Sequence, residues 1–244
     1  MRPISLLSYS SLDSTSLEAR RQLETCPLPF AVHADEQKSG YGQQSREWIS
    51  PVGNLYITLA LPLAGLTHPL PLLPLRVAIT VARWIESVWQ VQVQLKWPND
   101  LMHNGRKLGG ILCETSLQDG AAQSVLIGIG INVQHAPDED LGPSAYPSVA
   151  LADLVSDPGW VMGGSKQWAE LLLERWYALW EMSHEEILSG FSQLQIGPGE
   201  KWVSAEGLVY RDCGISEAGF LQLEREGERL ELVSATHGFR WVPS

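Results

Sequence analysis

The sequence contains little cysteine: only Cys26, Cys113 and Cys213 occur among its 244 residues. They are far apart and odd in number, and neither a CxxC pair nor histidines at ligand spacing accompany them, which argues against a disulfide framework and a zinc site. The hydrophobic runs are too short to cross a bilayer, and the N-terminus lacks the long apolar core of a signal peptide. We therefore expect a cytoplasmic protein with reduced thiols and no membrane partner.

Positive charge is also scarce. The chain has 17 Lys and Arg against 28 Asp and Glu, which gives a net charge of -11, and only five of the cations are lysines. A nucleic-acid-binding protein would show a basic patch, so we expect no nucleic-acid partner. An anionic ligand would have to be held by a few well-placed cations, and each internal Lys or Arg is therefore informative.

The apolar pattern predicts an α+β protein with a mixed sheet flanked by helices. With 44% hydrophobic residues and ten Trp, the composition is that of a globular protein. Thr15 and Glu18 fit a capping box that begins a helix through about Cys26. Amphipathic periodicity predicts helices over 75–89 and 165–182, and apolar or alternating runs predict strands at the N-terminus, 30–34, 55–63, 90–97, 107–115 and 124–133. Short strands then follow, which predicts a domain over 1–190 and a small all-β domain over 195–244.

The segment "SGYGQQSREW" is a candidate anion-binding loop. Gly40 and Gly42 permit positive φ and a close backbone approach, so successive N–H groups could surround a phosphate or carboxylate with Arg46 as a bidentate partner. The segment matches neither the dinucleotide-binding nor the P-loop motif. The alternative is a connecting loop with ordinary turn glycines.

The stretch "LKWPNDLMHNGRKLGGILCE" carries two of the five lysines. The pair Asn104-Gly105 predicts a hairpin turn, and the proline after Trp97 would fix a turn that projects Asn99 and Asp100 from a strand end. Lys107 enters a half-buried strand, where a cation strongly stabilises an anion. The alternative is that Lys96 and Lys107 are solvated lysines at a strand edge.

Two further segments have both a structural and a functional interpretation. "GIGIN", residues 128–132, ends a buried strand, and its glycines serve either close strand packing or the approach of a nucleotide. Ser14 and Thr15 serve a helix cap, a polar ligand or both. No GxSxG or comparable nucleophile motif occurs, so we expect no covalent enzyme intermediate.

Taken together, these motifs resemble those of the biotin protein ligases, also called biotin–[acetyl-CoA carboxylase] ligases. The matching segments, in order, are "DSTS", "EQKSGYGQQSREWISPVGNLY", "KWPND" with "RKLGGILCE", and "GIGIN". The resemblance implies a class II synthetase-like catalytic domain with a C-terminal SH3-like β-barrel. It also implies that biotin and MgATP form biotinyl-5′-AMP, from which biotin passes to a lysine of a biotin carboxyl carrier protein.

The resemblance also implies roles for individual residues. Lys107, Arg46 and Asp100 are the expected catalytic residues: Lys107 contacts the biotin carboxylate and the α-phosphate, and Asp100 orients the acceptor lysine. Lys96 helps to hold the "KWPND" motif in shape. The expected biotin-binding residues are Ser14, Thr15, Gln37, Gly40, Tyr41, Gly42, Gln43, Lys107 and Gly110. The expected ATP-binding residues are Arg46, Trp48, Asn99, Gly130 and Asn132, and Asn132 is also the candidate Mg²⁺ ligand.

The chain departs from the family pattern in three places. The family's loop is commonly GRGRxGRxW, and here Tyr41, Gln43 and Ser45 replace Arg, Arg and Gly, which is expected to weaken the phosphate contacts. Ser216 replaces the Asp of a C-terminal GID turn. No helix-turn-helix pattern precedes Asp13, so we expect a short form without a DNA-binding domain. A homodimer remains an open alternative.

Two other functions remain in competition with biotin ligation. A lipoate or octanoyl ligase or transferase shares the implied fold, but "KWPND" and the polar groups of Ser14, Thr15 and Gln37 favour biotin. A non-catalytic biotin-binding regulator is suggested by the missing loop arginines, but mere binding would not require Lys107, Asp100 and Asn132 together.

Overall fold

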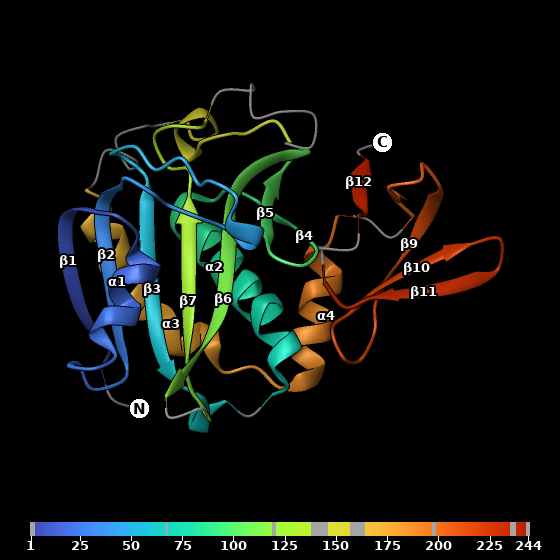
Figure 1. Ribbon diagram of the computed structural model, residues 1–244. Helices are drawn as coiled ribbons and strands as arrows, with labels where there is room; N and C mark the ends of the chain where they lie inside the picture. Colours follow the sequence, from blue (N-terminus) through green and yellow to red (C-terminus); the bar gives the residue numbers. More distant parts are fainter. Residues whose placement is uncertain are drawn as a thin grey trace.

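The computed structural model describes residues 3–66, 68–118, 121–137, 146–156, 164–196, 199–234 and 238–242. A seven-stranded sheet with helices on both faces forms the larger part of the molecule, and a five-stranded antiparallel sheet lies beside it (Figure 1). These sheets confirm the predicted α+β class and the small C-terminal all-β module. Among the helices in the described ranges, none is long and apolar enough to span a membrane.

The large sheet has the strand order β1-β2-β3-β7-β6-β5-β4, and only β1 and β2 run parallel. The strands are β1 (Ser5–Leu12), β2 (Phe30–Gln37), β3 (Leu55–Pro62), β4 (Gln94–Lys96), β5 (Asp100–His103), β6 (Arg106–Gln118) and β7 (Ala121–Ile131). The interior strand β3 is buried along almost its whole length because both faces of the sheet are covered there.

The helices divide between the two faces of this sheet (Figure 1). One face carries α1 (Thr15–Gln22), and the other carries α2 (Leu73–Trp89) and α3 (Ser165–Trp180). Trp84, Trp168 and Trp176 are fully buried in the layer behind the sheet, where large aromatic side chains contribute much of the apolar area removed from water. A further helix, α4 (His184–Leu194), packs against α2 and β4.

The structure corrects three details of the sequence-based prediction. Ser14, not Thr15, is the N-cap of α1: its hydroxyl accepts from the Ser16 N–H at 3.2 Å, and the helix already ends at Gln22. Residues 90–93 are not in a strand, because Gln90 adopts a left-handed conformation and β4 pairs with β5 only from Gln94. Helix α4 was not predicted, although its capping box of Ser183 and Glu186 is visible in the sequence.

The C-terminal sheet has the order β11-β10-β9-β8-β12. Its strands are β8 (Lys201–Val203), β9 (Val209–Ile215), β10 (Leu221–Arg225), β11 (Glu228–Leu232) and β12 (Arg240–Val242). Trp202 and Trp241 belong to the same buried hydrophobic cluster as the core of the large sheet. The Trp97 indole N–H also donates to the Gly219 carbonyl at 3.0 Å. The second sheet is therefore packed directly against the β4–β5 end of the first, and the division into domains 1–190 and 195–244 remains a prediction.

Candidate functional site

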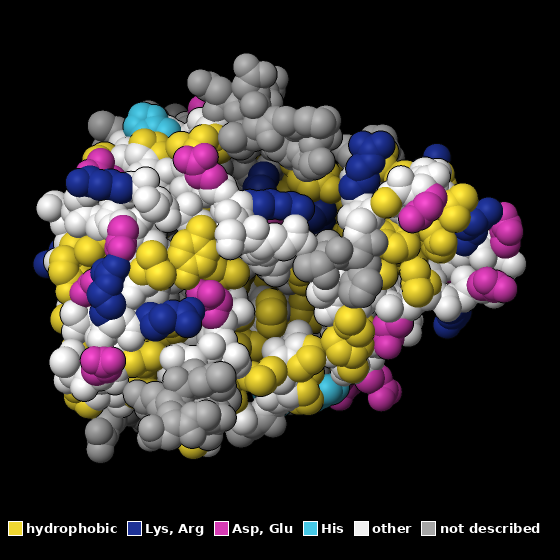
Figure 2. Space-filling view, in the orientation of Figure 1, with side chains coloured by type: hydrophobic (Ala, Val, Ile, Leu, Met, Phe, Trp, Pro, Cys, Tyr) yellow, Lys and Arg dark blue, Asp and Glu magenta, His cyan; other side chains and the backbone are white. Residues whose placement is uncertain are grey.

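A cavity of about 1000 Å³ lies between the large sheet, the segment 38–50 and the C-terminal sheet. Figure 2 shows this hollow on the front face, with Lys and Arg side chains along its upper edge. Its volume is at the upper end of the range for small-molecule sites. With the exception of Gly40, every residue predicted to bind ligand lines it: Ser14, Thr15, Gln37, Tyr41, Gly42, Gln43, Arg46, Trp48, Asn99, Asp100, Lys107, Gly110, Gly130 and Asn132.

The central charged group is a buried carboxylate between two lysines. Lys107 Nζ lies 2.6 Å from Oδ1 of Asp100, and Lys96 Nζ lies 2.9 Å from Oδ2. Burial raises the pKa of Asp100, but the charges of Lys107 and Lys96 outweigh it and hold that pKa well below its usual range. Asp100 is therefore ionised at neutral pH, and both scarce cations meet at one anion.

The local fold explains why these three residues meet. Lys96 pairs with Asp100 in the β4–β5 register, and the hairpin turn at Asn104 brings Lys107 back beside β5. The Asn99 side-chain amide donates to the Ile111 carbonyl at 2.5 Å, which fixes the turn against β6. The amide of Asn99 thus has a structural partner, and its predicted role in ATP binding remains a prediction.

A group of hydroxyls and amides lies at another part of the cavity wall. The N–H and the hydroxyl of Thr15 donate to Oε1 of Gln37 at 2.8 and 3.0 Å, and Thr58 donates to the Thr15 hydroxyl at 2.9 Å. Ser14 and Ser16 complete this group. The structure therefore brings together Ser14, Thr15 and Gln37 as predicted. Sequence reasoning missed Thr58, although it interrupts the apolar run "LYITLALP" at a buried position.

The segment 38–50 crosses in front of the large sheet (Figure 1) and is closed by its own backbone hydrogen bonds. The Trp48 N–H donates to the Gly40 carbonyl at 2.9 Å, and the Gly42 N–H donates to the Arg46 carbonyl at 2.8 Å. Gly40 is needed for the close approach, because a Cβ there would lie 2.6 Å from the Trp48 carbonyl oxygen. We call residues 38–50 the flap.

Gly40 and Gly42 permit positive φ, but neither residue adopts it. Gly42 has a φ of -114°, and the left-handed residues of the flap are Gln44 and Ser45, with φ of 59° and 55°. Ser45 occupies the position where the family pattern has glycine, so this chain places a side chain where glycine is favoured. The turn is thus made by different residues from those the glycine pattern indicated.

Trp48 lies on a floor made by two glycines. Gly110 and Gly130 face each other across β6 and β7, and a Cβ on Gly130 would come within 2.7 Å of the indole. Lys107 Nζ lies 5.4 Å from the centre of the ring, and the indole nitrogen is buried and has no hydrogen-bond partner among the residues that the structure describes. The glycines of "LGGIL" and "GIGIN" therefore serve packing against the flap as well as the wall of the cavity.

The flap residues Arg46 and Tyr41 have different surroundings. Arg46 is exposed and its guanidinium donates to Oε1 of Gln44 at 3.1 Å. The Tyr41 hydroxyl donates to Oε2 of Glu114 at 3.0 Å, and Arg20 lies 3.3 Å from the other oxygen of that carboxylate. Burial and the charge of Glu114 raise the pKa of Tyr41, so its phenol stays protonated and ties the flap to β6 and α1.

Asn132 is almost fully buried and supports Lys107. Its side-chain amide donates to the carbonyls of Lys107 and Val149 at 3.3 and 3.4 Å. The described residues contain no cluster of three His, Cys, Asp or Glu side chains suited to a metal ion. A Mg²⁺ ion bound mainly by phosphate oxygens of a nucleotide fits this donor set better than one held by the protein alone.

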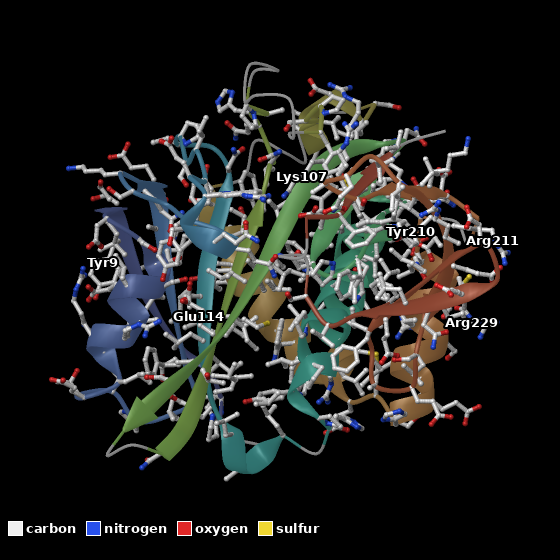
Figure 3. All side chains as sticks on the ribbon, turned by 45° about the vertical axis from the view of Figure 1, so that its right-hand side comes forward. Tyr9, Lys107, Glu114, Tyr210, Arg211 and Arg229 are labelled. Carbon is white, nitrogen blue, oxygen red and sulfur yellow. The ribbon has the colours of Figure 1, made fainter. Side chains whose placement is uncertain are left out.

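Several cavity residues lie outside the predicted set. Tyr146, Trp202 and Arg240 line it from the C-terminal side. Lys96 Nζ lies 4.8 Å from the Tyr146 ring and 5.7 Å from the Trp202 ring. Burial and the charge of Asp100 raise the pKa of Tyr146 to about 12, which keeps it neutral. No local sequence pattern links these residues to Lys96. Figure 3 shows Lys107 far from Arg211 of β9 and Arg229 of β11.

A family model and two relatives with known names all match this chain to ligases. A family model described as the biotin/lipoate A/B protein ligase family matches residues 8–132. A biotin–[acetyl-CoA-carboxylase] ligase of Paracoccus denitrificans is 35% identical over 142 residues, covering 57% of this chain and 59% of that protein. A bifunctional ligase/repressor BirA of Bacillus subtilis is 37% identical over 136 residues, covering 55% of this chain and 42% of that protein. The chain spans about half the length of these relatives.

Among solved structures, a biotin protein ligase from Aquifex aeolicus in complex with biotin and ATP is similar to the whole chain. The TM-score is 0.79 at 25% identity, and the match covers 98% of this chain and 99% of that one. The similarity therefore includes the C-terminal sheet as well as the large sheet.

Proposed function

Because this chain belongs to the biotin/lipoate A/B protein ligase family, we propose that it activates biotin with MgATP and transfers it to a lysine of a biotin carboxyl carrier protein. The observation that carries the proposal is the position of Lys107. Its ammonium group lies in one cavity with the hydroxyl and amide group around Thr15 and Gln37. A cation there can hold two anions together, as attack of a carboxylate on a phosphate requires.

In the first step a carboxylate oxygen of biotin attacks the α-phosphorus, and the bond from that phosphorus to the bridging oxygen of pyrophosphate breaks. Lys107 neutralises the negative charge on the carboxylate and the phosphate, which otherwise repel each other. Ser14, Thr15 and Gln37 hydrogen-bond the polar ureido ring. Arg46 and Trp48 of the flap cover the adenylate.

In the second step the neutral amine of the acceptor lysine attacks the activated carbonyl and an amide bond forms. The bond from the carbonyl carbon to the phosphate oxygen breaks, AMP leaves, and the nitrogen gives up one proton to water. Asp100 is ionised and accepts a hydrogen bond from that amine, which orients it toward the carbonyl. Mg²⁺ neutralises part of the phosphate charge when it is bound, and Asn132 is its proposed protein ligand. The homodimer and the cytoplasmic location also remain proposals.

A substrate panel tests the proposal. Pyrophosphate release from MgATP is measured with biotin, lipoate or octanoate as the acid, and we expect release with biotin alone. Lys107→Ala is expected to slow this step by roughly 10²- to 10³-fold, as the loss of one charge-stabilising group does in other enzymes. Release with lipoate but not with biotin would support the lipoyl alternative, and tight biotin binding without release would support the regulator.

A further inference from the structure

Asp100 has two cationic partners, although one would neutralise it. The two partners differ in their freedom to move. The Lys96 side chain is 10% exposed, whereas that of Lys107 is 28% exposed. The Lys107 side chain is therefore less enclosed than that of Lys96, and it is the partner with room to turn away from Asp100.

Lys96 is held from the C-terminal side. Its ammonium group lies against the rings of Tyr146 and Trp202, an arrangement in which the ring faces attract a cation. Trp202 is itself fixed, because its indole N–H donates to Oδ2 of Asp212 at 3.0 Å, and Asp212 also accepts from Gln195. Tyr146 and, from the C-terminal sheet, Trp202 thus keep Lys96 in place next to Asp100.

The proposed first step requires Lys107 to turn toward the anionic groups of biotin and ATP. If Lys107 were the sole counter-ion of Asp100, this movement would leave an unpaired buried carboxylate, which is strongly unfavourable. We propose that Lys96 is a positioning residue that stays on Asp100 as its permanent counter-ion and so frees Lys107 for the ligand. This inference rests on the proposed biotin activation, and it also gives the C-terminal sheet a part in that step.

A purely structural role for Lys96 makes a different prediction. If Lys96 only holds the turn before β5, its loss damages the site whatever residue stands at position 100. If it acts as a counter-ion, its loss traps Lys107 on Asp100, and removing the charge of Asp100 releases Lys107 again. The double variant therefore distinguishes the two roles.

The experiment compares wild type, Lys96→Met, Asp100→Asn and the double variant. Two quantities are measured in each protein: the single-turnover rate of pyrophosphate release with biotin and MgATP, and the dissociation constant for biotin alone by calorimetry. We expect Lys96→Met to slow pyrophosphate release by roughly tenfold or more and to weaken biotin binding. The double variant should recover much of the lost rate and of the lost biotin affinity. Lys166→Met removes an exposed lysine that pairs with Glu170 at 3.9 Å, and it serves as the control with unchanged values.

A second pair of variants tests the same idea with Lys96 in place. Trp202 and Trp241 face each other across β8 and β12 and are both 4% exposed, but only the Trp202 N–H has a hydrogen-bond partner among the described residues. Trp202→Phe should release Lys96 and slow pyrophosphate release severalfold more than Trp241→Phe does. This comparison still applies if Lys96→Met does not fold.

The outcomes separate the inference from the proposed function. A double variant as slow as Lys96→Met, with equally weak biotin binding, would overturn the counter-ion role, and so would equal effects of the two Trp variants. Wild-type protein that binds biotin but releases no pyrophosphate would overturn the proposed function and this inference with it. Recovery of both the rate of pyrophosphate release and the biotin affinity in the double variant would establish the counter-ion role of Lys96.

Discussion

Gly130→Ala tests whether the glycine floor positions the flap. A Cβ at this position would lie 2.7 Å from Cε2 and Nε1 of Trp48, well inside van der Waals contact. At Gly110, the partner across the two strands, the closest ring atom would be 3.4 Å away. Gly130→Ala must therefore displace the indole and the flap with it, whereas Gly110→Ala leaves the indole nearly in place.

The effect of Gly130→Ala on ATP use depends on whether the flap or the sheet moves to relieve the contact with Trp48. Inserting a methyl group into a packed contact typically costs about 1–3 kcal/mol. The flap lies over the cavity and can move away, so the cost should appear in ligand binding rather than in unfolding. We expect kcat/KM for ATP to fall by about 5- to 150-fold in Gly130→Ala, and by much less in Gly110→Ala.

The assay is pyrophosphate release at a range of ATP concentrations with saturating biotin, and thermal unfolding of both variants is the control for stability. We expect similar Tm values for the two variants and wild type. Equal kcat/KM values for the two variants would refute the idea that Trp48 must lie on Gly130. A large loss of Tm in Gly130→Ala alone would show that the flap cannot relieve the contact.

Three further predictions concern stability and the flap. Ser45→Gly removes a side chain from a residue with a left-handed backbone, φ of 55°. It should raise the free energy of unfolding, measured in urea, by up to about 1 kcal/mol. A decrease would contradict the inference that the Ser45 backbone is strained. Tyr41→Phe removes the 3.0 Å hydrogen bond to Glu114 and should weaken the hold on the flap by about 1 kcal/mol, which faster amide exchange of Trp48 would reveal and unchanged exchange would refute. Asp100→Asn should lower stability at neutral pH. Because the pKa of Asp100 is lowered in the folded protein, the difference in unfolding free energy between wild type and Asp100→Asn is fully present above about pH 4 and shrinks as the pH falls further. A difference that grows in acid would contradict a stabilising role for the ion pairs of Asp100 with Lys96 and Lys107.

The local part of the charged site could be predicted from the sequence. Alternation from Gln90 to Trp97 places Lys96 on the polar side of its segment, and the turn at Asn104 returns Lys107 to the neighbouring strand. Both inferences depend on residues within about ten positions of each other, where backbone geometry alone fixes the neighbours. The resemblance to a family then predicted which of these residues contact ligand, and those roles remain predictions.

The remaining features depend on contacts between segments far apart in the chain. Nothing in the sequence near Lys96 indicates that Trp202 will cover it, because their contact exists only once the C-terminal sheet has packed against β4 and β5. The residues that form the left-handed turn of the flap could not be identified from the sequence for a related reason. Gly40 is required for close approach to Trp48 rather than for its φ, so the left-handed turn falls on Gln44 and Ser45 instead.

The most direct test of the central claim is transfer of biotin to a carrier. The protein is incubated with biotin, MgATP and a biotin carboxyl carrier domain, and the mass of the carrier is measured. The account predicts that each carrier gains one biotinyl group, that a carrier with its acceptor lysine changed to arginine gains none, and that Lys107→Ala gives almost no product. A carrier that stays unmodified while the wild-type protein binds both biotin and ATP would contradict it.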